Sequence, residues 1–341
     1  MERAAFVNPH SDAGYHDATN NSYFEGLVHW GDPYGESSGM CSPASRSTCA
    51  TPTQESPYTS PLPAPRALST AFSNIPASTY DSRPDVELVS SDAVHFSVSS
   101  DVLRRASYND FAGALQSIPL CASNILPRFH VPDTAEVLNI LLHASYGTSL
   151  IPFTPSFPLL FEVVRRMPTY GLDPQTYVSY GSVVFECLRP YAAVAPIEVY
   201  TLAAAHDLLP LAQVASTYLL SYPLQSITEA QARLIGAVYL ERLVRLHRTR
   251  LATLNELLRC PPEFHAETAG CSFAAQEDLT RAWVGAVGYV MKHANPDIVA
   301  NTLQQKLGKL KEGMICQECR KVVERRIWDV VVSWTMAPGS I

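Results

Sequence analysis

The sequence predicts an α+β domain that continues into an all-α region and follows a disordered tail. Residues 86–88 and 94–98 alternate apolar and polar side chains with the period of two that a half-buried strand requires. After residue 174 the apolar side chains recur at helical spacing, whereas the first part of the chain is rich in Ser, Thr and Pro and has neither period. We therefore expect a disordered tail at 1–80, a small sheet capped by helices at 84–175 and a helical region at 176–335.

The tail has a composition that buries too little apolar surface to offset the entropy of ordering it. Four Ser-Pro or Thr-Pro pairs begin at Ser42, Thr51, Ser56 and Ser60. Proline-directed phosphorylation is one interpretation, in which each phosphate adds about −1.5 to −2 charge. The interpretation that we favour is that a Ser/Thr/Pro-rich tail contains such pairs by chance.

The domain is predicted to begin with a hairpin and a helix. The alternating runs at 86–88 and 94–98 flank a polar turn and can each direct one face toward a core. Ser99 or Ser100 is expected to cap the helix that follows, because a serine hydroxyl accepts from the free N–H groups of a first turn. Residues 128–131 predict a third strand, which Pro132 ends.

Residues 133–147 predict a helix that is buried on more than one side. Asp133 and Glu136 have the spacing of a capping box, and the apolar side chains, Leu141 among them, cover more than one face. A further helix over 159–167 should end at the Tyr170-Gly171 pair.

The region after residue 174 is predicted to be helical throughout. Ser226 and Glu229 have capping-box spacing before a long segment that reaches about Leu258. The last helix should carry an apolar stripe that ends at Trp334.

These elements resemble the BTB/POZ domain. The resemblance lies in the hairpin and first helix, and then in a leucine-rich helix that ends in Tyr-Gly: Asp85, Val86, Phe96, Val98, Val102, Leu103, Arg104, Ala106, Ser107 and Phe111, followed by Val137, Leu141, Leu142, Tyr146 and Gly147. Residues 84–335 as a whole are similar to the BTB-containing proteins of mushroom-forming fungi. The resemblance implies a protein–protein interaction scaffold or adaptor that self-associates and has no active site.

Asp85, Leu103 and Arg104 are our candidate interaction residues. Asp85 stands at a position that BTB dimers use, although a surface residue before a strand is an equal alternative. The sequence departs from the family at Ser99, where the family usually has His, and in the loop 147–157, which lacks the acidic residue of cullin-recruiting BTB domains. A substrate adaptor of a cullin-type ubiquitin ligase and a transcriptional co-regulator remain alternative functions.

Two cysteines near the C-terminus have the spacing of a metal knuckle. Cys316 and Cys319 form a CxxC motif, Cys271 is a third candidate ligand, and His265 or Cys260 is a candidate fourth. The competing interpretation is that Cys319 packs in the apolar stripe of the last helix. We favour packing and predict no metal, with bound zinc as one alternative and a redox dithiol as another.

Composition and motifs argue against several other functions. The net charge of −7 and the pI near 5.8 do not favour binding to nucleic acid or an anionic membrane. The start of the chain has no apolar core typical of a secretory signal, and the most apolar stretch is interrupted by His206, Asp207 and Pro210. Nucleophile elbows, zinc-protease motifs and nucleotide-binding loops are absent from the sequence. We expect an intracellular protein, cytoplasmic or nuclear, that is not an enzyme, takes no cofactor and acts on protein partners.

Overall fold

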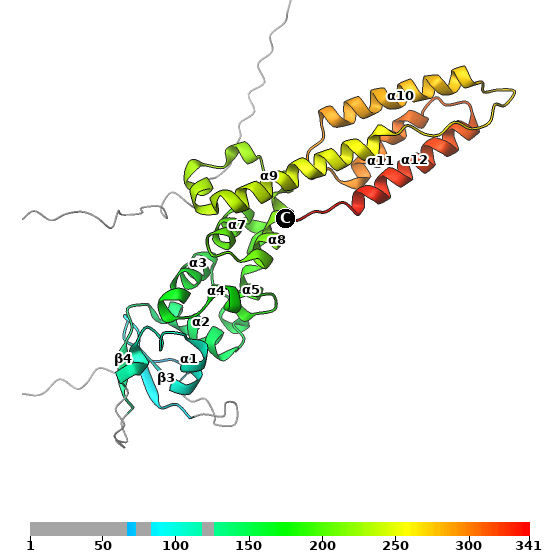
Figure 1. Ribbon diagram of the computed structural model, residues 1–341. Coiled ribbons are helices and arrows are strands. Elements are labelled where there is room, and N and C mark those ends of the chain that lie inside the picture. Colours follow the sequence, from blue (N-terminus) through cyan, green and yellow to red (C-terminus); the bar gives the residue numbers. More distant parts are fainter. Residues whose placement is uncertain (1–66, 73–82, 118–125) are drawn as a thin grey trace, which may run out of the picture. The chain divides into compact units, whose positions relative to one another are not determined.

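A small sheet and a large majority of helices make up the described part of the protein (Figure 1). The computed structural model describes residues 67–72, 83–117 and 126–341. The predicted α+β class is confirmed at this level. The four Ser/Thr-Pro pairs and nearly all of the predicted tail lie outside the described residues.

The sheet has four strands in the order β1-β3-β2-β4. Its strands are β1 (Ala67–Leu68), β2 (Val86–Val89), β3 (Val94–Val98) and β4 (Arg128–His130). The predicted hairpin is β2 and β3, which pair antiparallel with Val86 opposite Val98, and the predicted third strand is β4, which runs parallel to β2. A buried Glu87 on β2 forms an ion pair with Arg128 on β4, which joins the hairpin to the later strand.

Six residues before the tail boundary predicted at residue 80 pack on the folded domain. β1 pairs parallel with β3, and Ser97 donates its backbone N–H to the carbonyl of Phe72 at 3.0 Å. The Phe72 side chain is 2% exposed and lies against the rings of Phe96 and Tyr146. A lone aromatic residue in a polar segment has no periodic neighbours, so the sequence pattern does not reveal its burial.

The first hydrophobic core extends well beyond the boundary predicted at residue 175. It runs from Phe72 through Leu243 and takes in the sheet, eight helices and part of a ninth, which begins at Glu229. The eight helices are α1 (Ser100–Ala106), α2 (Ala135–Tyr146), α3 (Phe157–Arg166), α4 (Pro174–Tyr177), α5 (Val183–Leu188), α6 (Tyr191–Val194), α7 (Pro196–Ala205) and α8 (Leu209–Tyr218). Short 3-10 turns lie at Ala114–Ser117, Ile151–Phe153, Met167–Tyr170, Leu219–Ser221 and Leu224–Ser226.

The helix α2 is buried on more than one side, as its sequence predicts. Val137, Leu138, Ile140, Leu141 and Leu142 are all 5% exposed or less. The predicted capping box is not formed. Instead Asp92, in the hairpin turn, accepts the N–H of Ala135 at 2.9 Å, so the cap comes from another segment.

Asp133 is part of a buried polar contact. It accepts the hydroxyl of Tyr170, and its carboxylate lies 3.1 Å from Arg166. Burial, followed by the hydrogen bond to Asp133, raises the pKa of Tyr170. The next residue, Gly171, has a φ of +69°, and a Cβ there would lie 2.6 Å from the Ser107 hydroxyl. The predicted Tyr-Gly ending of the helix is therefore confirmed, with a close approach that only glycine permits.

A second, smaller core is formed by the C-terminal helices. They are α9 (Glu229–Arg259), α10 (Phe273–Lys292), α11 (Ala300–Gly308) and α12 (Gln317–Thr335), with a 3-10 turn at Lys309–Lys311. The helix α9 is broken at Gly236, where φ is +73°. The helix α9 contributes to both cores, with Leu243 in the first and Leu254 and Leu258 in the second. Its capping box uses Thr228 and Gln231, two residues later than predicted. None of the described helices combines the length and apolarity needed to span a bilayer.

Replacing Leu141 by Ala should lower the free energy of unfolding by about 2–5 kcal/mol, because the fully buried side chain leaves a cavity. Urea denaturation of the full-length chain measures the loss. The matched control is Leu234→Ala on α9, which is 49% exposed and should cost far less. Equal losses in the two variants would contradict the burial of α2.

Phe72→Ala should cost about 3–5 kcal/mol if residues 67–72 belong to the folded domain. Leu68→Ala is the control, since Leu68 lies on the same segment and is 56% exposed. A thermal melt of the Phe72 variant that matches the wild type would show that the segment is not part of the core.

Candidate metal centre

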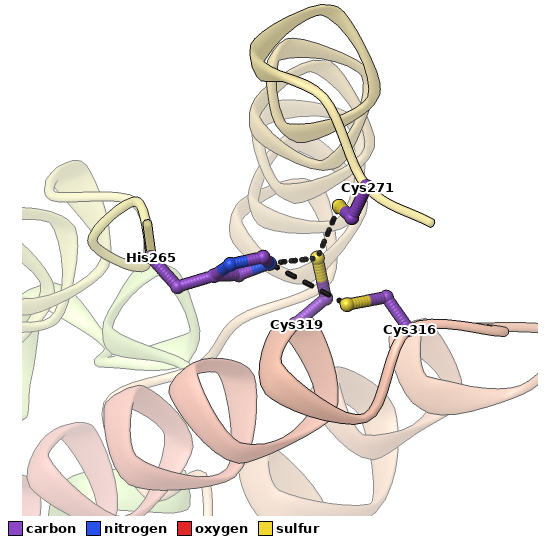
Figure 2. Close-up of side chains that lie close together, drawn as sticks. All are labelled: His265, Cys271, Cys316 and Cys319. Atoms are coloured by element: carbon purple, nitrogen blue, oxygen red, sulfur yellow. Dashed lines mark hydrogen bonds between the residues drawn. The ribbon is translucent and has the colours of Figure 1, made fainter. Parts of the chain in front are cut away.

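Four side chains that can ligate a metal converge at the end of the second core. His265 and Cys271 lie in the loop between α9 and α10, and Cys316 and Cys319 lie at the start of α12. Figure 2 shows the four side chains pointing toward one another from these two segments. One ligand atom from each residue falls in a group whose members all lie within 4.8 Å of one another.

The contacts within this group join the imidazole to the thiols. His265 Nε2 lies 3.2 Å from Cys319 Sγ and 3.5 Å from Cys316 Sγ. The Sγ atoms of Cys271 and Cys319 are 3.5 Å apart. Cys271 and Cys319 are buried, whereas His265 and Cys316 are partly exposed. The group is thus open to solvent on one side and backed by the second core on the other.

The backbone at the start of α12 favours a thiolate at Cys316. Cys316 is the N-cap residue of that helix, so its side chain lies beside N–H groups that have no partner within the helix. The nearby backbone N–H groups of Cys319 and then of Glu318 lower the pKa of the Cys316 thiol to about 7. At Cys319, burial is the largest influence and raises the pKa to about 12.

His265 is held with Nε2 facing the thiols. Its Nδ1 lies 2.7 Å from the carbonyl oxygen of Ala266, which can only accept, so Nδ1 carries the proton and Nε2 has a free lone pair. The backbone of His265 is fixed by Gln276 on α10. The Gln276 amide accepts from His265 N at 2.9 Å and donates to His265 O at 3.1 Å. Gln276 is 1% exposed, so this double hydrogen bond is protected from water.

Cys271 is positioned by a tight turn. Thr268 and Cys271 exchange both backbone hydrogen bonds at 3.1 Å, which directs the Cys271 side chain back into the second core. The turn thereby places Cys271, which lies in a loop, next to the thiols at the start of α12.

The structure brings together all three candidate cysteine ligands and selects His265 as the fourth group. Cys260 is exposed and is not a member of the group. The packing interpretation of Cys319 also holds, because Cys319 is 6% exposed within the second core. Three sulfur donors and one imidazole nitrogen form a soft donor set that suits a tetrahedral metal ion. The roles of Ala266 and Gln276 had no signal in the sequence.

The three candidate interaction residues lie apart from this centre. Asp85 is exposed, but both its carboxylate oxygens bond Ser100, accepting the backbone N–H at 2.7 Å and the hydroxyl at 2.6 Å. Asp85 therefore caps α1, and the Ser99 side chain does not. Leu103 is completely buried in the first core, so its side chain has no exposed surface for a partner. Arg104 is exposed and donates to the carbonyl of Leu115.

Comparison with known proteins returns nothing: no family model, curated protein or solved structure matches this chain.

Removing the cap of α1 should cause a measurable loss of stability. Asp85→Ala should lower the free energy of unfolding by about 0.5–2 kcal/mol, because it removes the acceptor of the Ser100 N–H and hydroxyl at the start of α1. Asp85→Asn keeps an acceptor oxygen and should recover most of this loss in chemical denaturation. Equal destabilisation by both variants would argue against a capping role.

Proposed function

We propose that this chain is a protein–protein interaction scaffold or adaptor that works through a BTB/POZ-like domain at its first core and associates with itself. The support comes from the way in which the segments that carry the sequence resemblance meet. A hairpin, the helix directly after it and a leucine-rich helix ending in Tyr-Gly all pack in one hydrophobic core. A chance resemblance of apolar spacing would not require these segments to be neighbours.

One hydrogen bond is the strongest single observation in support of the proposal. The hydroxyl of Tyr146, at the end of α2, accepts the backbone N–H of Ser99 at 2.7 Å. Ser99 is the first residue before α1, at the place where BTB/POZ domains usually have histidine. The Tyr of one motif is therefore joined to the corner of the other, and Asp85 completes that corner by capping α1.

The histidines of the first core favour a structural role over acid–base catalysis. His143 is 7% exposed and lies edge-on to Phe72, with its Nδ1 2.6 Å from the Thr148 hydroxyl. Burial lowers the pKa of both His143 and His206. Neutral, packed imidazoles contribute to the core of a binding domain, so they give no reason to propose an enzyme.

The exposed side of α1 offers a polar surface for a partner. Asp101, Arg104 and Arg105 are exposed there, next to the capped corner. Charges at the rim of an interface select partners and set the rate of association. This surface is where we place the self-association contact.

Light scattering tests the proposal on the full-length chain. The wild type should have a mass of at least twice the 37.4 kDa of one chain, and Arg104→Glu with Arg105→Glu should shift it toward the single-chain mass. The control is Arg245→Glu with Arg248→Glu, two exposed arginines of α9. A thermal melt of each variant shows whether the fold is kept.

A wild-type chain that stays a monomer over the whole accessible concentration range would rule out the self-association. If both arginine pairs lowered the mass equally, the effect would be one of net charge, and α1 would not be the contact surface.

A further inference from the structure

We propose that His265, Cys271, Cys316 and Cys319 bind one zinc ion as a closed, structural site. This inference is independent of the scaffold proposal, because it concerns the second core and would stand if the first core had another function.

Three of the six spacings between the ligand atoms are close to those of a tetrahedral zinc site. Zinc lies about 2.3 Å from a cysteine sulfur and about 2.0–2.1 Å from a histidine nitrogen, which places two sulfurs about 3.8 Å apart and a sulfur and a nitrogen about 3.6 Å apart. The corresponding contacts here are 3.5 Å between Cys271 and Cys319, 3.2 Å from His265 Nε2 to Cys319 and 3.5 Å from His265 Nε2 to Cys316. Shifts of a few tenths of an ångström would satisfy these three distances, and the other three pairs of ligand atoms lie within 4.8 Å.

The donor types select the metal. Calcium, magnesium and manganese prefer oxygen ligands, and the group contains no carboxylate. Zinc takes three thiolates and one imidazole in structural sites, where the four protein ligands fill the tetrahedron and leave no position for a substrate or reacting water. A structural role therefore follows from the ligand count.

The surroundings of the ligands are those of a metal site. Metal-bound histidines commonly donate their second ring nitrogen to a carbonyl, as His265 does to Ala266. The buried Gln276 fixes the backbone of the same residue with two hydrogen bonds. Such support is expected of a ligand, whereas a histidine that is merely packed has no need for an oriented Nε2.

Neither competing interpretation accounts for all four residues. A disulfide between any two of the three cysteines, those of the CxxC motif included, would leave the third cysteine and His265 without a role. Between Cys271 and Cys319 it would also require the sulfur atoms to close from 3.5 Å to about 2.05 Å. Packing accounts for Cys271 and Cys319 in the core, but it does not explain an imidazole directed at two thiols.

Zinc at this point would join both ends of the α10–α11 segment. His265 and Cys271 precede α10, and Cys316 and Cys319 open α12, so one ion fixes the entry to and the exit from these two helices. A small core needs such cross-links, because its apolar burial alone offsets little of the ordering entropy.

Metal analysis of the full-length protein tests the site. Protein purified without chelators should contain about one zinc per chain, and Cys316→Ser with Cys319→Ser should lose it. The matched control is Cys187→Ser with Cys260→Ser, two cysteines outside the group, which should keep the zinc. Co²⁺ added to metal-free wild type should give the absorption of a tetrahedral thiolate complex, and this readout does not depend on any variant folding.

Hydrogen exchange of the wild-type protein shows which helices the bound zinc stabilises. Chelation should increase exchange in α10–α12 and leave α2 unchanged, and Zn²⁺ alone should reverse the increase.

The proposal would be overturned by protein that contains no zinc and takes up neither Zn²⁺ nor Co²⁺ when reduced. Intact mass showing a Cys271–Cys319 disulfide in freshly purified protein would also overturn it, as would zinc that is lost equally from the control variant.

Discussion

After a break at Gly236, the long remainder of α9 packs into two hydrophobic cores, and the rest of the described fold depends on it. The first part of α9 packs against α7, where the Tyr200 hydroxyl donates to the carbonyl of Tyr239. Its last turns carry Leu254 and Leu258 into the second core, and the carbonyl of Leu258 accepts from the buried indole of Trp283. Between these contacts Arg250 is 9% exposed, yet its guanidinium is satisfied by the carbonyls of Pro296, Ala337 and Pro338 and stacks on the Trp334 ring. A buried charge needs such partners, so the position of Arg250 ties the C-terminal segment to the middle of the helix.

Much of the fold could be read from local periodicity. The hairpin, β4, the buried α2 and the Tyr-Gly helix ending all depend on residues within a few positions of one another. The errors arise where a distant segment supplies a local need. Both N-terminal caps come from another segment, because Asp85 caps α1 and Asp92 caps α2 while the serine and the capping box expected there are unused. The first core also extends past the boundary predicted at residue 175. A helix pattern shows which face is apolar, but it does not show which core that face joins.

The candidate metal centre, too, was predictable from the sequence only in part. The CxxC spacing and the three cysteines were visible in the sequence, and so was the choice between His265 and Cys260. That choice depends on a tight turn at Cys271 and on the buried amide of Gln276, neither of which has a sequence signature. Cys319 also belongs to the apolar stripe of α12, so packing and ligation are not exclusive there. A residue that serves both purposes is ambiguous in sequence and resolved only by its neighbours in space.

The two-residue strand β1 has a consequence for the solubility of this protein. It covers the outer edge of β3, where Ser69 donates to the carbonyl of His95 and Ser97 donates to that of Phe72. An uncovered strand edge presents unpaired backbone groups to any other extended chain. A fragment cut to begin at Pro84, where the regular pattern starts, would therefore carry an open edge beside an emptied aromatic pocket. We expect such a fragment to aggregate during expression. The cause would be the loss of residues 67–72, a segment whose sequence gives no sign of a structural role.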